Sequence, residues 1–506
     1  MVQVSSRSRL RLSHWFSLVA NLLFTNGLLV LITCLTLSGC GGGRYGTIQQ
    51  QPQQPQQPPP NQGVLTKITI DPPTSVETGE VVQLSAAGSD PYGTPVAIPF
   101  VNWTSSDSSV AYVTVDGNLV AFGPGNVTIT ASADPVSGSL PVTINPGITF
   151  TLGAEETVFN WNTDRCEDLD LPDVPASVIR RADGMLVMSA GDAPNNYVSV
   201  GPDFSSLKRV CTHPVLVSGD NWSADSYDNQ EWVEVLYREG NVIHALVDVE
   251  YHDPVSLNCS PGDSHPGNPC WYNSITYASS TDGGLTFTYP TPPAQVVAPP
   301  WQKWDATGNP DNYGDYWPSH IVLAPDNYYY FFFNAKVRFG TNSMCAARTQ
   351  TLADPTSWRA WDGTGFNLQM LSPYTSSNPT ACAPVMTPPD DLAQSVLTFN
   401  TYLNQYLLVG AGQTGGPTEW VCGFYYKLST DLIHWTPLRL LRTATAWGGP
   451  CLPGTEVGVV YASIIDHNDT TPNFERSGRT PYLYYTRDNG GLDRDLVRVP
   501  MTITEH

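Results

Sequence analysis

Five acidic residues stand at the starts or ends of short stretches in which apolar and polar residues alternate. They are Asp173, Glu231, Glu250, Asp315 and Glu456. Alternation of this kind predicts β-strands, which can bring side chains from distant parts of a chain to one place. Two carboxyl groups held together in this way can act as a general acid and a general base. The sequence therefore predicts a catalytic site built from paired carboxyl groups.

The neighbours of these residues suggest their roles. Asp173 is the expected base, and the expected acid is one of Glu231, Glu250 and Glu456. We favour Glu250 because a tyrosine and a histidine follow it directly and can tune its pKa. An acidic residue at a strand end is more often a turn or salt-bridge residue. That interpretation stays open for each of them.

An internal repeat indicates which elements would position the carboxyl groups. The pattern Asp-x-x-x-Ser-x-Ile occurs at 173–179 and at 315–321, and a third copy at 461–465 lacks the Asp. A second pattern, a strand that ends in a polar turn, recurs along the same region. Its copies lie at 197–210, 275–287, 346–358, 424–435 and, in divergent form, 482–499. These repeats predict a five-bladed β-propeller with four-stranded blades, with six blades or a jelly roll as alternatives.

The composition agrees with an all-β fold. Of the 506 residues, 42 are Gly, 44 are Pro and only 14% are charged, which favours short strands and many turns over helices. The formal net charge of −22 argues against nucleic acid and anionic lipid as electrostatic partners.

The N-terminus has the features of a targeting signal. Three arginines precede an apolar stretch that ends in Leu37-Ser38-Gly39-Cys40, which resembles the bacterial lipobox. The resemblance implies a signal peptide over 1–39 and a lipid on Cys40, with a transmembrane anchor as the alternative. The Gln- and Pro-rich residues 40–63 are the expected tether. We therefore expect a protein of the bacterial cell envelope, periplasmic or extracellular, that meets the membrane only through its lipid.

The remaining cysteines agree with export. Setting aside Cys34 and Cys40 leaves eight of the ten, an even number that predicts disulfide bonds in an exported chain. Cys259 and Cys270 flank a loop rich in Pro, Gly and Ser and are the predicted pair. The pairing of the others stays open. They are Cys166, Cys211, Cys345, Cys382, Cys422 and Cys451.

Residues 64–147 alternate as in a β-sandwich. The run WTSSDSSVA starts at Trp103, and a Gly turn and the run PGNVTITA follow it. This segment resembles the bacterial Ig-like domain of group 2. The resemblance implies a spacer or adhesive module that carries no chemistry of its own.

Residues 150–506 contain two further motifs. The runs DVPASVIRRADG (173–184) and STDLIHWT (429–436) resemble motifs of the five-bladed glycosidases related to arabinanase, xylosidase, invertase and levansucrase. The resemblance implies hydrolysis of glycosidic bonds in a neutral oligo- or polysaccharide by a monomeric enzyme. A non-catalytic adhesin that binds glycan or protein on the same scaffold is the alternative.

The same resemblance suggests ligand contacts. The rings of Trp301, Trp304 and Trp317 could stack on sugar rings. His320 could face the propeller axis, where related glycosidases hold an ion, or could be a buried structural histidine. The acidic run EDLDLPD at 167–173 could bind a structural calcium ion or be a solvated loop. We expect no other cofactor.

The run STDGGLTF at 280–287 fits the Asp-box of sialidases and other propeller proteins. Its Asp and two Gly predict a hairpin turn. A looser copy, STDLIHW, occurs at 429–435, so we interpret the motif as architectural. A sialidase is argued against because the sequence lacks the arginine motifs that bind the carboxylate of sialic acid.

Overall fold

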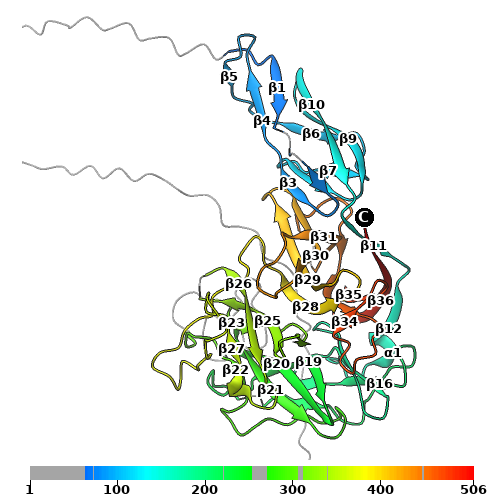
Figure 1. The fold of residues 1–506 in the computed structure, drawn as a ribbon, viewed down its shortest axis with the longest axis vertical. Coiled ribbons are helices and arrows are strands. Elements are labelled where there is room, and N and C mark those ends of the chain that lie inside the picture. Colours follow the sequence, from blue (N-terminus) through cyan, green and yellow to red (C-terminus); the bar gives the residue numbers. More distant parts are fainter. Residues whose placement is uncertain are drawn as a thin grey trace, which may run out of the picture.

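The computed structural model describes residues 63–71, 73, 75–219, 221–253, 271–305, 312–338, 340–446 and 449–506. These residues form a small N-terminal domain and a larger body, and the C-terminus lies near the junction of the two (Figure 1). Within the described ranges the helical elements are α1 (Trp161–Asp164) and η1 (Pro355–Ser357). The expected all-β fold class is confirmed.

The N-terminal domain is a sandwich of three small sheets, ordered β1-β4-β5, β2-β10-β9-β6 and β3-β8-β7. Alternate apolar residues such as Val76, Leu119 and Ile129 face inward and form its core. The strands are β1 (Lys67–Ile70), β2 (Val76–Glu77), β3 (Val81–Gln83), β4 (Ala86–Ser89), β5 (Pro95–Val96), β6 (Asn102–Ser105), β7 (Ala111–Val113), β8 (Asn118–Ala121), β9 (Gly125–Ala133) and β10 (Val136–Asn145).

The larger body consists of five antiparallel units of four main strands that follow one another along the chain, and we call these units blades one to five. Blade one contains β13 (Ser177–Arg180), β14 (Leu186–Ser189), β16 (Val198–Gly201) and β17 (Lys208–Arg209). Blade two contains β19 (Gln230–Glu239), β20 (Val242–His252), β21 (Trp271–Ser280) and β22 (Val296–Ala298). Blade three contains β23 (Tyr313–Tyr316), β25 (Tyr329–Lys336), β26 (Asn342–Thr349) and β27 (Arg359–Ala360), with β24 (Val322–Leu323) beside β25.

Blade four contains β28 (Ala393–Asn400), β29 (Gln405–Gly415), β30 (Trp420–Ser429) and β31 (Arg439–Thr445). Blade five contains β33 (Val459–Ile465), β35 (Tyr482–Gly490) and β36 (Asp493–Glu505), and is completed by β11 (Ile148–Leu152) and β12 (Glu156–Phe159). Four shorter strands lie between these: β15 (Asn195–Asn196), β18 (Leu216–Val217), β32 (Glu456–Val457) and β34 (Arg476–Ser477).

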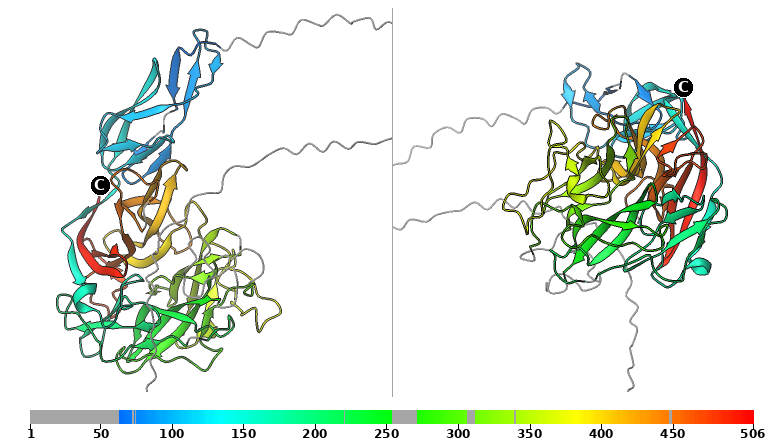
Figure 2. Two further views of the ribbon diagram at one scale, coloured as in Figure 1. Left: turned by 180° about the vertical axis from the view of Figure 1, so that it is seen from behind. Right: turned by 60° about the horizontal axis from the view of Figure 1, so that its bottom comes forward.

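The body is closed by pairing its first strands with its last. β11 and β12 pair antiparallel with β36, for example Leu152 with Met501 and Phe159 with Leu496. The start of the body is thus hydrogen-bonded to its end, because β11 and β12 complete the sheet of blade five. The two views in Figure 2 show β36 (red) beside the cyan strands that precede blade one.

Two of the repeat serines connect neighbouring blades. Ser177 Oγ accepts a hydrogen bond from the backbone N–H of Leu236 in blade two (3.0 Å). Ser463 Oγ in blade five donates to the carbonyl of Ala176, next to β13 of blade one (2.7 Å). The third, Ser319, accepts from the N–H of Phe332 within blade three (2.9 Å), so the repeat marks buried contacts of the inner strands.

Blade five also reaches the other blades through the segment 472–478. The Glu475 carboxylate accepts from Tyr237 Oη (3.0 Å) in blade two and from the N–H of Leu323 (2.9 Å) in blade three. Its carbonyl accepts from the N–H of Phe399 (3.0 Å) in blade four. This segment crosses the end of the body where the inner strands finish, so the opposite end is the one available for a site.

The Asp-box forms the predicted hairpin turn. Asp282 Oδ1 accepts from the N–H groups of Leu285 (3.1 Å) and Thr286 (3.0 Å), and Asp431 Oδ1 does the same for Ile433 (3.0 Å) and His434 (2.8 Å). Both carboxylates are used by the local backbone, which supports an architectural role.

Within the described residues there are three disulfide bonds, which use six of the eight cysteines for which disulfides were predicted. They join Cys166 to Cys211, Cys345 to Cys382 and Cys422 to Cys451. The predicted pair Cys259–Cys270 and the lipobox Cys40 lie outside the described residues. Among the helices of the described ranges, none is long and apolar enough to cross a membrane.

The N-terminal domain is fixed to blade four by reciprocal hydrogen bonds. Glu419 accepts from Tyr112 Oη (3.0 Å) and from the N–H of Val115 (2.9 Å), while Asp116 accepts from the N–H groups of Thr418 and Glu419 (both 3.0 Å). Glu419 is only 8% exposed, and Val120 of the sandwich belongs to the apolar core of blades three and four. The domain is therefore a packed part of the molecule rather than a loose spacer.

This interface predicts that Glu419→Ala lowers the free energy of unfolding by roughly 1–3 kcal/mol. The substitution leaves a hydroxyl and an N–H without partners in a part-buried contact. Thermal melts of the full chain measure the loss. Glu505→Ala, which removes an exposed carboxylate at the C-terminus, is the matched control. Equal melting temperatures for both variants would show that the contact contributes nothing.

Candidate active site

Five carboxyl groups gather where the inner strands of blades one and two begin, and we call them the site carboxyls. They are Asp173, Asp192, Glu234, Asp248 and Glu250. Asp173 precedes β13 and Asp192 follows β14, while the other three lie on β19 and β20. Their charges act on one another: Glu250 raises the pKa of Asp173, and Asp173 raises the pKa of Asp192 and of Glu234. The structure therefore brings Asp173 and Glu250, two of the predicted residues, to one place.

Strand geometry accounts for the contribution of blade two. Asp248 and Glu250 are two residues apart on β20, so their side chains point to the same face of the sheet. Trp232 of β19 is paired with Asp248 and therefore shares that face. The β19–β20 register shifts between Val233 and Val235, which makes Glu234 an extra residue in a β-bulge. A bulge re-aims side chains, and here it turns a glutamate toward the other carboxyls.

Similar irregularities occur at the starts of other inner strands. Trp317 (φ 56°), Gln394 (φ 50°) and Tyr461 (φ 57°) adopt left-handed backbone conformations that bulky residues rarely occupy. Two of the three contact the site carboxyls: the Trp317 N–H donates to Asp248 Oδ2 (3.3 Å) and Tyr461 Oη donates to Asp173 Oδ1 (3.1 Å). Such strain is common where a functional group must be placed against local preference.

Asp173 lies in an environment of mixed charge. Its Oδ1 forms an ion pair with Nη1 of Arg494, which β36 supplies from blade five, and accepts the Tyr461 hydroxyl. Burial raises the pKa of Asp173, Arg494 and Tyr461 oppose that rise, and the charge of Glu250 adds to it. The side chain keeps 22% of its surface exposed, so a ligand can reach it.

Glu250 is the second reachable carboxyl, with 15% of its side chain exposed. Its Oε2 lies 3.0 Å from His252 Nε2, and its Oε1 accepts from Asn273 Nδ2 (3.1 Å). The histidine named from the sequence as a neighbour of Glu250 is thus in direct contact with it. These two contacts fix the orientation of the carboxyl group.

Glu234 and Asp248 form a buried layer behind the reachable pair. They are 2% and 3% exposed, and Glu234 Oε2 and Asp248 Oδ1 have no hydrogen-bond partner within the described part of the chain. Burial raises the pKa of both groups well above the usual range, and neighbouring carboxylates raise it further. Burial therefore favours the neutral form of both groups, which limits the negative charge in the site.

Two further carboxyls, Asp315 and Asp391, lie close to Asp248. Asp391 was not among the site residues predicted from the sequence. Asp315 on β23 is 8% exposed, and burial raises its pKa well above the usual value. Asp248, Asp315 and Asp391 all raise the pKa of the Tyr316 hydroxyl, so the three carboxyls surround one ring. Asp391 could have been found, because 391–397 reads DLAQSVL and repeats the Asp-x-x-x-Ser pattern with Leu in place of Ile.

Two other predicted candidates, Glu231 and Glu456, lie apart from the site carboxyls. Glu231 is on the face of β19 opposite Trp232, where it accepts from the Tyr289 hydroxyl and from the N–H of Gly219 (2.9 Å). Burial raises its pKa to about 8. Glu456 forms ion pairs with Arg442 and Arg487 (2.7 Å to the latter). The structure therefore does not bring these two residues together with Asp173 and Glu250.

The three tryptophans predicted to contact a ligand lie in different surroundings. Trp317 adjoins the site carboxyls through Asp248, whereas Trp304 is built into a cluster of aromatic rings: it stacks on Tyr313 (5.5 Å, 16°) and donates to Asp253 (2.9 Å). Trp301 is half-buried in the segment after β22. Of the three, only Trp317 has a recorded contact with a site carboxyl.

His320 and the acidic run at 167–173 show no metal site. The pKa of His320 is lowered to about 4 by burial, and its Nε2 has no hydrogen-bond partner within the described residues. Asp170 is paired with Arg209 (2.9 Å) and Asp168 with Arg165 (3.5 Å), so these carboxylates face arginines. The described ranges contain no group of three or more side chains arranged to hold a metal ion.

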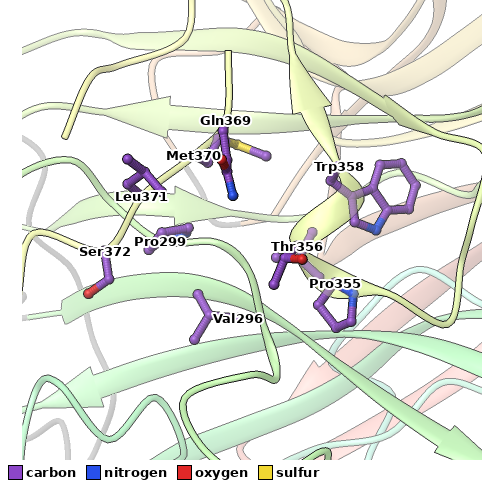
Figure 3. Close-up of a pocket in the computed structure, with 10 residues that line it drawn as sticks. Val296, Pro299, Pro355, Thr356, Trp358, Gln369, Met370, Leu371 and Ser372 are labelled. Atoms are coloured by element: carbon purple, nitrogen blue, oxygen red, sulfur yellow. The ribbon is translucent and has the colours of Figure 1, made fainter. Parts of the chain in front are cut away.

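The molecule also has a small pocket away from these residues. It has a volume of about 100 Å³ and lies between β22 and η1, where Val296, Pro299, Pro355 and Met370 line it (Figure 3). None of the site carboxyls is among its lining residues. The site carboxyls, which can transfer protons, are therefore a better candidate for an active site than this pocket.

Solved structures similar to this chain include several glycoside hydrolases. The catalytic domain of the Coprinopsis cinerea GH62 α-L-arabinofuranosidase is 11% identical, with 70% of this chain and 98% of that chain covered and a TM-score of 0.41. An endo-arabinase from Bacteroides thetaiotaomicron is 11% identical, with 68% and 97% covered and a TM-score of 0.37. A Dyadobacter fermentans protein of unknown function is 12% identical, with 71% and 100% covered and a TM-score of 0.41.

No curated protein matches this chain. The family described as bacterial Ig-like domain (group 2) matches residues 64–144, which are the strands of the N-terminal sandwich. The predicted resemblance is confirmed, and this part of the chain is a bacterial Ig-like domain of group 2.

Proposed function

We propose that the propeller body hydrolyses glycosidic bonds of a neutral oligo- or polysaccharide at the site carboxyls. The observation that carries the proposal is the unlike surroundings of the two reachable carboxyls, Asp173 and Glu250. Asp173 is paired with Arg494 and accepts a tyrosine hydroxyl, whereas Glu250 has only neutral or titratable partners. Glycoside hydrolysis needs such a difference, because one carboxyl must hold a proton while the other stays charged.

The two groups would divide the reaction as follows. Arg494 and Tyr461 stabilise the charge on Asp173, which suits Asp173 to the role of the base. Glu250 would then be the acid and would give a proton to the leaving oxygen as the C1–O bond breaks. Asp173 would activate the attacking water or bond to C1 itself.

A second candidate is a non-catalytic binding protein. The ion pair between Arg494 and Asp173 favours it, because a carboxylate already neutralised by arginine is a weaker base. In both cases we place the protein at the bacterial cell envelope. The Ig-like domain and the three disulfide bonds are typical of exported bacterial proteins. The lipid on Cys40 remains part of this proposal.

Asp173→Asn and Glu250→Gln should each lower kcat by about 10²- to 10⁴-fold, because each removes one partner of the acid–base pair. Release of reducing ends from a panel of arabino-, xylo- and galacto-oligosaccharides measures the rate. Glu456→Gln, which changes a carboxylate of an ion-pair network outside the site, is the matched control. If wild type is inactive on every member while still binding one, the non-catalytic candidate replaces this proposal.

Glu231→Gln should leave the rate unchanged but alter how stability depends on pH. The pKa of Glu231 is about 8 in the folded chain against an ordinary 4.5, so its contribution to stability is complete below about pH 4.5 and disappears as pH rises through 8. The loss is about 5 kcal/mol at most. Thermal melts from pH 4 to 9 should therefore fall more steeply for wild type than for the variant. Parallel curves would contradict the burial argument.

Arg494→Gln should move the acid limb of the pH–rate profile to higher pH. Arg494 opposes the burial that raises the pKa of Asp173, so without the guanidinium that pKa rises further and Asp173 ionises later. Plots of kcat/KM against pH test this, with Arg487→Gln as a control that breaks an ion pair outside the site. An unchanged acid limb would mean that Asp173 is not the group whose ionisation limits the rate.

A further inference from the structure

Trp232 stands out among the side chains around the site carboxyls. It is only partly buried, whereas its neighbours Glu231 and Val233 on β19 are fully buried. Val233 joins the apolar cluster between blades one and two, and Trp232 is not part of that cluster. A large apolar ring is thus left partly open on the face that also carries Asp248 and Glu250.

The indole is held at one end only. Its Nε1–H donates to Asp192 Oδ1 (2.9 Å), and the same oxygen accepts the N–H of Ala193 (2.7 Å). Asp192 comes from blade one, so this hydrogen bond spans the boundary between two blades. The contact fixes the nitrogen-bearing edge of the ring, while the side chain keeps part of its surface exposed.

The position of Asp192 links this contact to the proposed chemistry. The charges of both Asp173 and Arg494 act on Asp192, which places it beside the reachable carboxyl of blade one. Trp232 therefore links Asp192 of blade one to the strand pair of blade two that carries Asp248 and Glu250.

Sugar rings present apolar C–H faces, and indole rings combine a wide apolar surface with a polar N–H that can be anchored. We propose that Trp232 is the platform on which a sugar ring stacks beside Asp173 and Glu250, and that Asp192 is a positioning residue that fixes the plane of that indole. The inference rests on the proposed carbohydrate function. It names neutral sugars with an open C–H face as the ligand class.

The test measures binding and turnover separately on the full chain. Isothermal titration with arabinotriose, xylotriose and galactotriose gives Kd for wild type, Trp232→Ala, Trp232→Phe, Asp192→Ala and Asp192→Asn. Trp232→Ala should weaken binding about tenfold, and Trp232→Phe should weaken it less because a ring remains. Asp192→Ala should weaken binding about three- to fivefold. Asp192→Asn should stay within about twofold of wild type, because its amide oxygen still accepts the indole N–H.

The control is Tyr92→Ala, which removes a 92% exposed ring from the Ig-like domain. A purely structural role for Asp192 would lower the melting temperature of both of its variants without separating their Kd values, and that result overturns the inference. Unchanged binding by Trp232→Ala overturns it as well. Sugar binding that depends on Trp232 but is never followed by hydrolysis supports the platform and defeats only the proposed reaction. If wild type binds none of the three sugars, the platform and the carbohydrate proposal both fail.

Discussion

The pairing of β36 with β11 and β12 is the constraint on which the rest of the body depends. A row of blades has two free edges unless its first and last strands meet, and these strands hydrogen-bond the start of the body to its end. The same pairing determines where Arg494 lies, because Arg494 is at the start of β36. Closure therefore sets the charge environment of Asp173 as well as the stability of the sheet.

Within the closed body, the site is made by departures from regular strand geometry. Regular alternation would place Glu234 with neighbouring core residues, and the bulge between Val233 and Val235 turns it toward Asp248. Trp317 in blade three and Tyr461 in blade five have left-handed backbone conformations, and each contacts a site carboxyl. Each departure costs on the order of 1–3 kcal/mol of backbone strain, which the packed blades around it must offset.

Charge and burial then divide the site into two layers. The inner carboxyls Glu234 and Asp248 are buried, and burial favours their neutral form, which reduces the repulsion between them and the other carboxyls. The outer carboxyls Asp173 and Glu250 keep some exposure and differ in their partners. Burial of the inner pair thus helps an acidic chain with a net charge of −22 to collect five carboxyl groups in one place.

Much of this could be predicted from the sequence, because alternation, turn residues and the repeat serine are local signals. These signals predicted the strands, the hairpin turn at Asp282 and the Ig-like domain. They also pointed to Asp173 and Glu250 as candidate site residues. That Glu231 lies on the other face of β19 could not be predicted, because alternation defines two faces of a strand but not which one the neighbouring blades cover. Asp192, Glu234 and Arg494 could not be found at all, since their roles arise from a bulge and from contacts across blades, such as the one between Asp173 and Arg494, 321 residues apart. Only the tertiary structure decides such contacts, because the closure that makes them has no local sequence pattern.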